Sequence, residues 1–192
     1  MYRLYNRVPA WVHQSSRRCS RSQVHSLCSD CNIAKMPDLM KIKQIVRKSL
    51  EACPVGTDEE NLQNGRDFYK FMFGNYPQLR VYFKGAENYT PEDVQKSERF
   101  QKQGQRILLA VHVVASCADD PIVFKGYIQE TVNRHRQYKM DPALWLAFFT
   151  VFVGFLETKK TVTEEEKAAW AEFGKLFNEE ALTHLARLGL PH

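Results

Sequence analysis

The chain has 192 residues, of which 44% are hydrophobic and 26% charged, as is typical of one soluble globular domain. Its net charge of +5 lies entirely in residues 1–35, because the other 157 residues carry 21 basic and 21 acidic side chains. A nucleic-acid-binding surface would need its basic excess on the folded domain, so no nucleic-acid partner is expected. No apolar run reaches the length of a membrane-spanning helix, so no membrane partner is expected either.

Residues 1–35 show neither a helical nor a strand period, and we predict a disordered basic extension before a domain of residues 36–192. The first 29 residues contain five arginines, six serines and no acid, a composition shared with mitochondrial transit peptides. A plain basic tail, or an upstream extension of a gene that starts at Met36, accounts for the same composition. The pair Cys28-x-x-Cys31 is a weak zinc motif, because no second pair matches it.

Only Cys53 and Cys117 lie outside this extension, which is too few for a disulfide scaffold and is typical of a reducing compartment. We therefore expect a cytoplasmic protein. A mitochondrial location, reached through the basic N-terminal extension, is the alternative.

Helical patterns begin at Asp38, where apolar residues recur at three- and four-residue steps up to about Leu50. Thr57 and Glu60 have the form of a capping box, which predicts the start of a second helix. That helix is long and aromatic, and Pro77 ends it and begins a short turn-like helix.

Thr90 followed by Pro91 predicts a helix that continues to about Ser116, and Pro121 then starts a shorter one. The remaining two helices are predicted to start after Asp141-Pro142 and at a second capping box formed by Thr163 and Glu166. No segment alternates with period two for long enough to form a strand. The sequence therefore predicts an all-α protein of about seven helices.

Gln103 and His135 lie thirty-two residues apart on either side of an Asp-Asp-Pro break, so two helices folded about it can hold a flat ligand between them. Tyr69 lies eight residues before Pro77, Phe83 six residues after it, and Gln103 twenty residues after Phe83. This set resembles the globin family, and within it the nematode globins, which carry a distal tyrosine and glutamine together. The strings K-Q-G-Q-R-I-L-L-A and Y-K-M-D-P-A-L-W look like those of nematode body-wall globins.

The resemblance covers about residues 38–187 and implies a globin fold of seven to eight helices around a haem b pocket. It makes His135 the proximal iron ligand, whose second ring nitrogen should donate to a backbone carbonyl. Without the resemblance, a lone histidine in a polar setting is more often an ordinary surface group. His112 is a poorer candidate, because it lies nine positions past Gln103 and so on the opposite side of the helix. Thr131 departs from the leucine common at its position in globins.

The resemblance also makes Tyr69 and Gln103 the distal pair that holds bound dioxygen. A phenol O–H and an amide N–H both donate to a ligand that gains negative charge on binding. Each such bond contributes about 1.5–3 kcal/mol, and each 1.4 kcal/mol changes affinity about tenfold. Without the family match, a core tyrosine and a solvated glutamine are the simpler interpretation.

Three further residues are implied as haem contacts. Phe83 would pack against the haem face, Ile107 would limit the space above the iron, and Arg106 would reach a propionate. From the sequence alone, ordinary core packing of Phe83 and a solvated Arg106 are equally good interpretations.

The predicted function is reversible binding of dioxygen at high affinity, for storage or transport, and we expect no enzymatic activity. The alternatives are a haem enzyme acting on nitric oxide or peroxide, a gas sensor, and a haem-free helical scaffold. No flavin or nicotinamide motif is present that would supply electrons for repeated turnover. The expected partners are dioxygen and other small gases, and association into homo-oligomers is left open.

Overall fold

The computed structural model of the protein describes residues 38–192. The predicted extension of residues 1–35, with its Cys28-x-x-Cys31 pair, lies outside the described residues.

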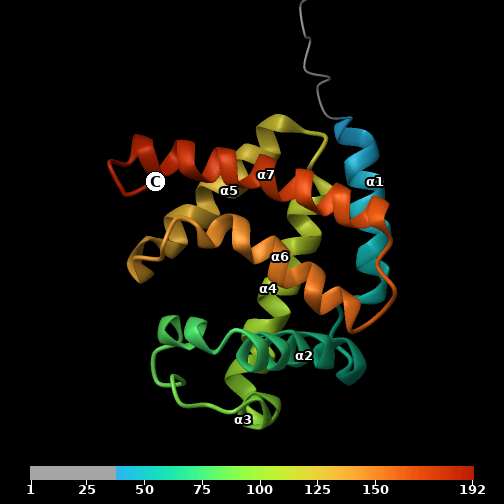
Figure 1. The fold of residues 1–192 in the computed structure, drawn as a ribbon, viewed down its shortest axis with the longest axis vertical. Coiled ribbons are helices and arrows are strands. Elements are labelled where there is room, and N and C mark those ends of the chain that lie inside the picture. Colours follow the sequence, from blue (N-terminus) through green and yellow to red (C-terminus); the bar gives the residue numbers. More distant parts are fainter. Residues whose placement is uncertain (1–37) are drawn as a thin grey trace, which may run out of the picture. The chain divides into compact units, whose positions relative to one another are not determined.

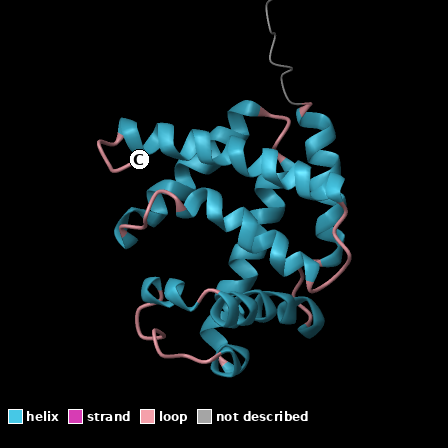
Figure 2. Cartoon of the chain, in the orientation of Figure 1, coloured by secondary structure: helices cyan, strands magenta, loops and turns pink. Residues whose placement is uncertain are grey.

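Seven α-helices and three short 3-10 helices make up the described residues, which contain no strand (Figures 1 and 2). In chain order they are α1 (Leu39–Ser49), η1 (Leu50–Ala52), α2 (Glu59–Asn75), η2 (Pro77–Tyr82), α3 (Pro91–Lys96), α4 (Glu98–Ser116), α5 (Pro121–His135), η3 (Arg136–Tyr138), α6 (Leu144–Glu157) and α7 (Glu164–Arg187). The predicted all-α class is confirmed.

The helix starts follow the predicted capping residues with two exceptions. One is α6, which begins at Leu144 behind Ala143, a residue that makes no side-chain cap, rather than directly after Asp141-Pro142. Thr163 forms the predicted capping box with Glu166, and Thr90, predicted as a helix cap, forms a further capping box with Asp93. The start predicted at Thr57 is wrong by one residue, because Asp58 is the N-cap and its carboxylate accepts the Asn61 backbone N–H at 3.0 Å.

The single helix predicted from Thr90 to about Ser116 is also wrong, because the chain breaks at Ser97. This residue is extended (φ −89°, ψ 116°), and its hydroxyl accepts the Phe100 N–H at 3.4 Å, so that α3 ends and α4 begins on either side of it. A serine side chain that bonds the backbone in this way competes with helix continuation.

Aromatic side chains of α6 and α7 form the centre of the core. Phe149 and Phe152 of α6 pack on Trp170 and Phe173 of α7, and the ring centroids lie 5.2 to 6.4 Å apart. Trp170 Nε1–H donates to the buried Ser49 hydroxyl at 2.8 Å, which joins α7 to α1. The tryptophan is thereby buried completely without leaving its polar atom unpaired.

α2 crosses α4 at a pair of glycines (Figure 1). A Cβ atom at Gly104 would lie 2.4 Å from the Gly65 carbonyl oxygen, and a Cβ atom at Gly65 would lie 2.6 Å from the Gly104 carbonyl carbon. Both neighbours are backbone atoms that no side-chain rotation can move. The two helices therefore approach this closely only because both positions lack a side chain.

We expect Gly104→Ala to lower the free energy of unfolding by about 3 kcal/mol, as overpacking against backbone does. Gly126→Ala in α5 is the matched control, since a Cβ atom there meets nothing within 4 Å. The control should leave stability unchanged or raise it by about 1 kcal/mol, because alanine is the better helix former. Urea unfolding of the two variants measures the contrast, and equal stabilities would contradict the close crossing.

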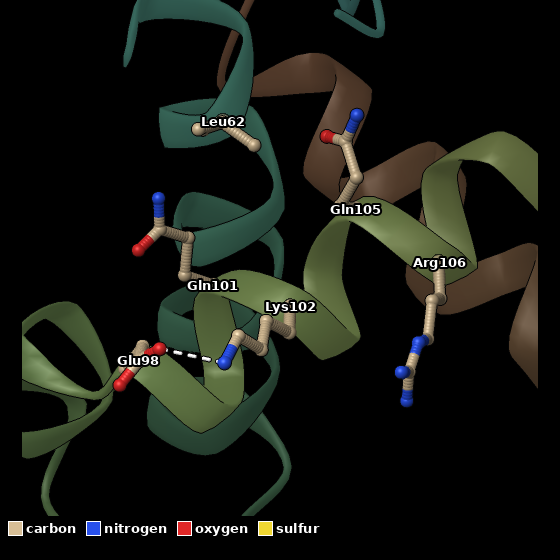
Figure 3. A pocket seen from close by; sticks show the side chains of 6 residues that line it. All are labelled: Leu62, Glu98, Gln101, Lys102, Gln105 and Arg106. Atoms are coloured by element: carbon tan, nitrogen blue, oxygen red, sulfur yellow. Dashed lines mark ion pairs between the residues drawn. The ribbon is translucent and has the colours of Figure 1, made fainter. Parts of the chain in front are cut away.

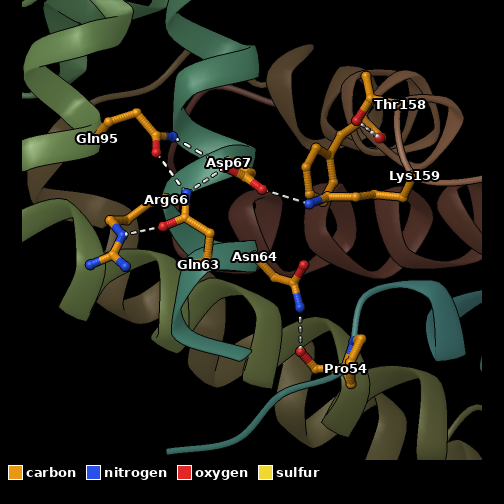
Figure 4. Close-up of polar contacts among 9 residues, drawn as sticks. Pro54, Gln63, Asn64, Arg66, Asp67, Gln95, Thr158 and Lys159 are labelled. Carbon is orange, nitrogen blue, oxygen red and sulfur yellow. Dashed lines mark hydrogen bonds and ion pairs between the residues drawn. The ribbon is translucent and has the colours of Figure 1, made fainter. Parts of the chain in front are cut away.

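A polar cluster ties α2 to α3 and to the segment after α6 (Figure 4). Asp67 accepts from Lys159 Nζ at 2.6 Å, from Gln63 Nε2 at 2.7 Å and from Gln95 Nε2 at 3.2 Å. Burial raises the pKa of the Asp67 carboxyl, but these three donors outweigh it and hold the pKa below its ordinary value. The carboxylate therefore stabilises the fold in its charged form.

A carboxylate whose pKa is lower in the folded state stabilises the protein above its unfolded pKa, and this stability is lost as the pH falls through the folded pKa. We therefore expect Asp67→Asn to lower the free energy of unfolding by about 1 kcal/mol at pH 7, a small value because the carboxylate is 30% exposed. The difference from wild type should shrink as the pH approaches about 3. Urea midpoints measured across this pH range test it, and a difference that does not depend on pH would contradict it.

Candidate functional site

His135 is the last residue of α5 and is half buried. Its Nδ1 lies 2.8 Å from the Thr131 carbonyl oxygen, one helical turn earlier. Since a carbonyl can only accept, Nδ1 carries the proton in this tautomer, and Nε2 keeps its lone pair. The imidazole therefore presents one neutral nitrogen suited to a metal, held in direction by its other nitrogen.

Two aromatic rings fix the imidazole from the side. Trp145 of α6 meets it edge-on at 5.4 Å and 74°, and Tyr138 of η3 meets it at 5.9 Å and 63°. Trp145 is buried, whereas Tyr138 is 50% exposed. Trp145 thus supports the imidazole from the core, and Tyr138 supports it from η3, which follows α5.

Tyr69 of α2 is 3% exposed and sits within a group of phenylalanine rings. Phe68, Phe83 and Phe100 lie at centroid distances of 5.4, 5.5 and 5.1 Å from it. Burial raises the pKa of the Tyr69 phenol above its ordinary value. The phenol therefore stays protonated, and remains a hydrogen-bond donor, throughout the physiological pH range.

Gln103 of α4 is half buried, and its side chain acts on Tyr69 as a hydrogen-bonding partner that lowers the phenol pKa. Tyr138 acts on the same phenol electrostatically and raises its pKa. The Gln103 side chain therefore lies near the Tyr69 phenol, and the role of the two residues as a distal pair stays a prediction.

Phe83 and Ile107 are half buried and pack against the core. Phe83 follows η2 and contacts Tyr69 edge-on at 81°. Met140, which follows the η3 corner after His135, is half buried too. Large apolar side chains therefore remain partly open near each of the candidate polar groups.

Arg106 is exposed and lines a surface depression of about 420 Å³ between α2 and α4 (Figure 3). The other lining residues are Leu62, Glu98, Gln101, Lys102 and Gln105. Lys102 pairs with Glu98 at 2.6 Å, and the Arg106 guanidinium stands apart from that pair. Neither Tyr69 nor Gln103 lines this depression, so the expected contact of Arg106 with a propionate stays a prediction.

The three other described histidines make hydrogen bonds elsewhere, His192 Nδ1 lying 3.0 Å from the Leu190 carbonyl oxygen. His112 Nε2 lies 3.0 Å from the Cys53 carbonyl oxygen, and His184 Nε2 lies 3.0 Å from Asn133 Oδ1. No cluster of three or more metal-binding side chains occurs within residues 38–192. A single imidazole, rather than a multi-ligand metal site, is the group that these residues offer to a metal.

Comparisons with known proteins show the family of the chain. The globin family model matches residues 66–181. A globin-like protein of Caenorhabditis elegans is 58% identical over 152 residues, which cover 79% of this chain and 96% of that protein. A myoglobin of Nippostrongylus brasiliensis is 48% identical over 151 residues, covering 79% and 97%. The solved structure of the C. elegans globin-like protein GLB-1 matches with a TM-score of 0.80 at 56% identity, covering 81% of this chain and 99% of that one.

The chain belongs to the globin family.

This globin has nematode relatives, so both the predicted fold and the predicted resemblance are confirmed. Family membership implies a haem cofactor and a small gas as ligand. Among the described residues, no helix is long and apolar enough to cross a membrane.

The residues present fit a haem. A neutral imidazole nitrogen on a fixed ring suits iron, and half-buried apolar side chains such as Phe83 and Ile107 suit the faces of a porphyrin. A buried phenol with an amide beside it suits a small polar ligand. These residue types are those that a globin haem pocket uses, and their assignment to the two sides of a haem stays a prediction.

Three residues of this globin's site were missed by the sequence analysis. Tyr138 and Trp145 support the imidazole, and Phe100 lies against Tyr69. Phe100 lies three residues before Gln103 and Tyr138 lies three residues after His135, so helical spacing from each predicted residue could have found both. Trp145 ends the string Y-K-M-D-P-A-L-W that carries the family resemblance, but it lies on another helix, so helical spacing from His135 does not predict their contact.

Proposed function

We propose that this globin holds one haem b through His135 Nε2 and binds dioxygen reversibly, with Tyr69 and Gln103 as donors to the bound gas. The iron of such a haem supplies one coordination position for an imidazole and one for a small gas. What supports the proposal most is the hydrogen bond from Nδ1 to the Thr131 carbonyl, which leaves Nε2 as the free nitrogen. The pairing of Gln103 with a buried Tyr69 supports the distal part.

In this proposal, the chain itself does three things. His135 holds the cofactor, and the Thr131 carbonyl fixes the direction of its ring. Tyr69 stays protonated because burial raises its pKa, so it can donate at any physiological pH. Its rigid ring loses little conformational freedom when fixed, and we therefore propose Tyr69 as the stronger of the two donors and a high affinity as the result.

Phe83 and Ile107 are proposed to contact the porphyrin, and Arg106 is proposed to pair with a propionate. The N. brasiliensis relative is named a myoglobin, which favours oxygen storage or delivery over a catalytic role. Cys53 and Cys117 are both free thiols, which supports the cytoplasm as the proposed compartment.

Oxygen binding by the purified, haem-loaded protein tests the function. We expect full, reversible oxygenation in repeated cycles and a slow oxygen dissociation measured by stopped flow. Turnover of nitric oxide or peroxide with a supplied reductant is the comparison assay. Rapid turnover, together with oxygenation that cannot be reversed, would favour an enzyme and overturn the carrier function.

A further inference from the structure

Phe100 packs against Tyr69 and against three other aromatic rings near it. Its ring lies 5.1 Å from Tyr69, 5.1 Å from Phe73, 5.9 Å from Phe83 and 6.0 Å from Tyr89. Its side chain is 0% exposed in the structure. Protein atoms therefore enclose Phe100 on all sides, which leaves it no surface with which to touch a haem or a gas.

The backbone presses Phe100 against Tyr69. Gly65 and Gly104 mark the close crossing of α2 and α4, as described above. Tyr69 lies one turn after Gly65 on α2, and Phe100 lies one turn before Gly104 on α4. The crossing fixes the separation of the two backbones beside these rings, so the helices themselves hold the rings in contact.

The outer side of Phe100 is closed as well. The Arg99 guanidinium lies over the Phe100 ring at 5.6 Å, and Arg99 Nη1 donates to the Lys84 carbonyl oxygen at 2.8 Å. Three residues later on the same helix, Gln103 reaches the Tyr69 phenol. α4 thus carries both the second distal donor and the ring that fixes the first.

We propose that Phe100 is a positioning residue for gas binding, which sets the orientation of the Tyr69 hydroxyl and through it the rate at which oxygen leaves. The inference rests on the proposed function, since it assumes that Tyr69 donates to the gas. Phe83 also contacts Tyr69, but it is half buried and is itself proposed to touch the haem. Phe100 acts on the gas only through Tyr69, and this makes its role separable by experiment.

A smaller side chain at this position leaves space beside the Tyr69 ring, which can then occupy more than one orientation. A hydrogen bond weakens steeply when its angle or distance changes, so part of the donation is lost although the hydroxyl remains. Phe100→Leu is therefore expected to raise the oxygen dissociation rate about three- to tenfold, less than removal of the hydroxyl does. In the Tyr69→Phe background, Phe100→Leu should change the rate by less than about twofold, because no donor is left to misplace.

The experiment uses four haem-loaded proteins: wild type, Phe100→Leu, Tyr69→Phe and the double variant. Oxygen dissociation is measured by stopped flow, and the infrared C–O stretch of each ferrous carbon monoxide complex reports the local field of the phenol independently of oxygen binding. Wild type should show one narrow band. Phe100→Leu should add or broaden a component toward the Tyr69→Phe frequency, and the double variant should match Tyr69→Phe.

Phe173→Leu is the matched control, because Phe173 is equally buried and packs on Phe149 and Trp170 rather than on Tyr69. It should weaken folding but leave the C–O band and the oxygen rate unchanged. If Phe100→Leu does not fold, Phe100→Met, which keeps more of the side-chain volume, replaces it in the same set.

The outcomes separate the two proposals. Suppose that Tyr69→Phe shifts both the C–O band and the oxygen dissociation rate. If Phe100→Leu then shifts neither, the positioning role is overturned and the donor role stands. The same conclusion follows if Phe100→Leu shifts both by equal amounts in the wild-type and Tyr69→Phe proteins. If Tyr69→Phe itself shifts neither, the donor role is wrong and the positioning role falls with it. An effect of Phe100→Leu that requires the Tyr69 hydroxyl supports the inference.

Discussion

His135→Gly is expected to reduce the haem retained by the purified protein by at least about tenfold, because the bond to the proximal imidazole is lost. Glycine leaves the backbone at the end of α5 in place and opens a space where the ring stood. Free imidazole can enter this space, so its addition should restore haem binding. The Soret absorbance relative to the protein absorbance measures both effects.

His112→Ala is the matched control, since His112 bonds the Cys53 carbonyl and lies outside the candidate site. It should keep its haem, apart from any loss that follows from a lower folding stability. If His135→Gly retains haem as well as His112→Ala does, and imidazole changes nothing, then another group holds the iron.

Tyr69→Phe is expected to raise the oxygen dissociation rate at least about tenfold. The substitution removes one hydroxyl from a ring that is 3% exposed and leaves the aromatic packing in place. A hydrogen bond to a charged acceptor contributes about 1.5–3 kcal/mol, and each 1.4 kcal/mol corresponds to a factor of ten. Stopped-flow displacement of oxygen by carbon monoxide measures the rate.

Tyr127→Phe serves as the control, because it removes the same atom from a half-buried tyrosine on α5, away from the aromatic group around Tyr69. Its oxygen dissociation rate should equal that of wild type. A Tyr69→Phe rate within about twofold of wild type would exclude the phenol as the main donor and leave Gln103 as the remaining candidate.

Most of the helices could be predicted because each begins at a local signal. Thr163 with Glu166 and Thr90 with Pro91 are such signals, and both operate in the structure. One error arose where two neighbouring residues compete for one role. Thr57 and Asp58 are both good caps, and only the structure decides for Asp58.

The break at Ser97 depends on contacts far along the chain. The sequence around it keeps helical spacing, but Gln95 is held by Gln63 and Asp67 of α2, and the Ser97 hydroxyl caps the next helix. Local propensity cannot include such a contact, and this is why the prediction joined α3 to α4.

The candidate site likewise has one part that the sequence predicts and another part that it does not. The family resemblance names His135, Tyr69 and Gln103, and helical spacing gives their faces. The supporting rings come from other elements: Trp145 lies on α6 and Phe100 is pressed on Tyr69 by the glycine crossing. Packing between helices far apart in sequence determines these contacts, so a single sequence does not reveal them.

Resonance Raman spectroscopy of the ferrous, ligand-free protein tests the central claim most directly, because the iron–imidazole stretch reports the proximal bond itself. The band should be present in wild type, absent from His135→Gly, and restored by added imidazole at a shifted frequency, since free imidazole is not covalently attached to α5. An unchanged band in His135→Gly without imidazole would contradict the assignment of His135 as the residue that holds the haem.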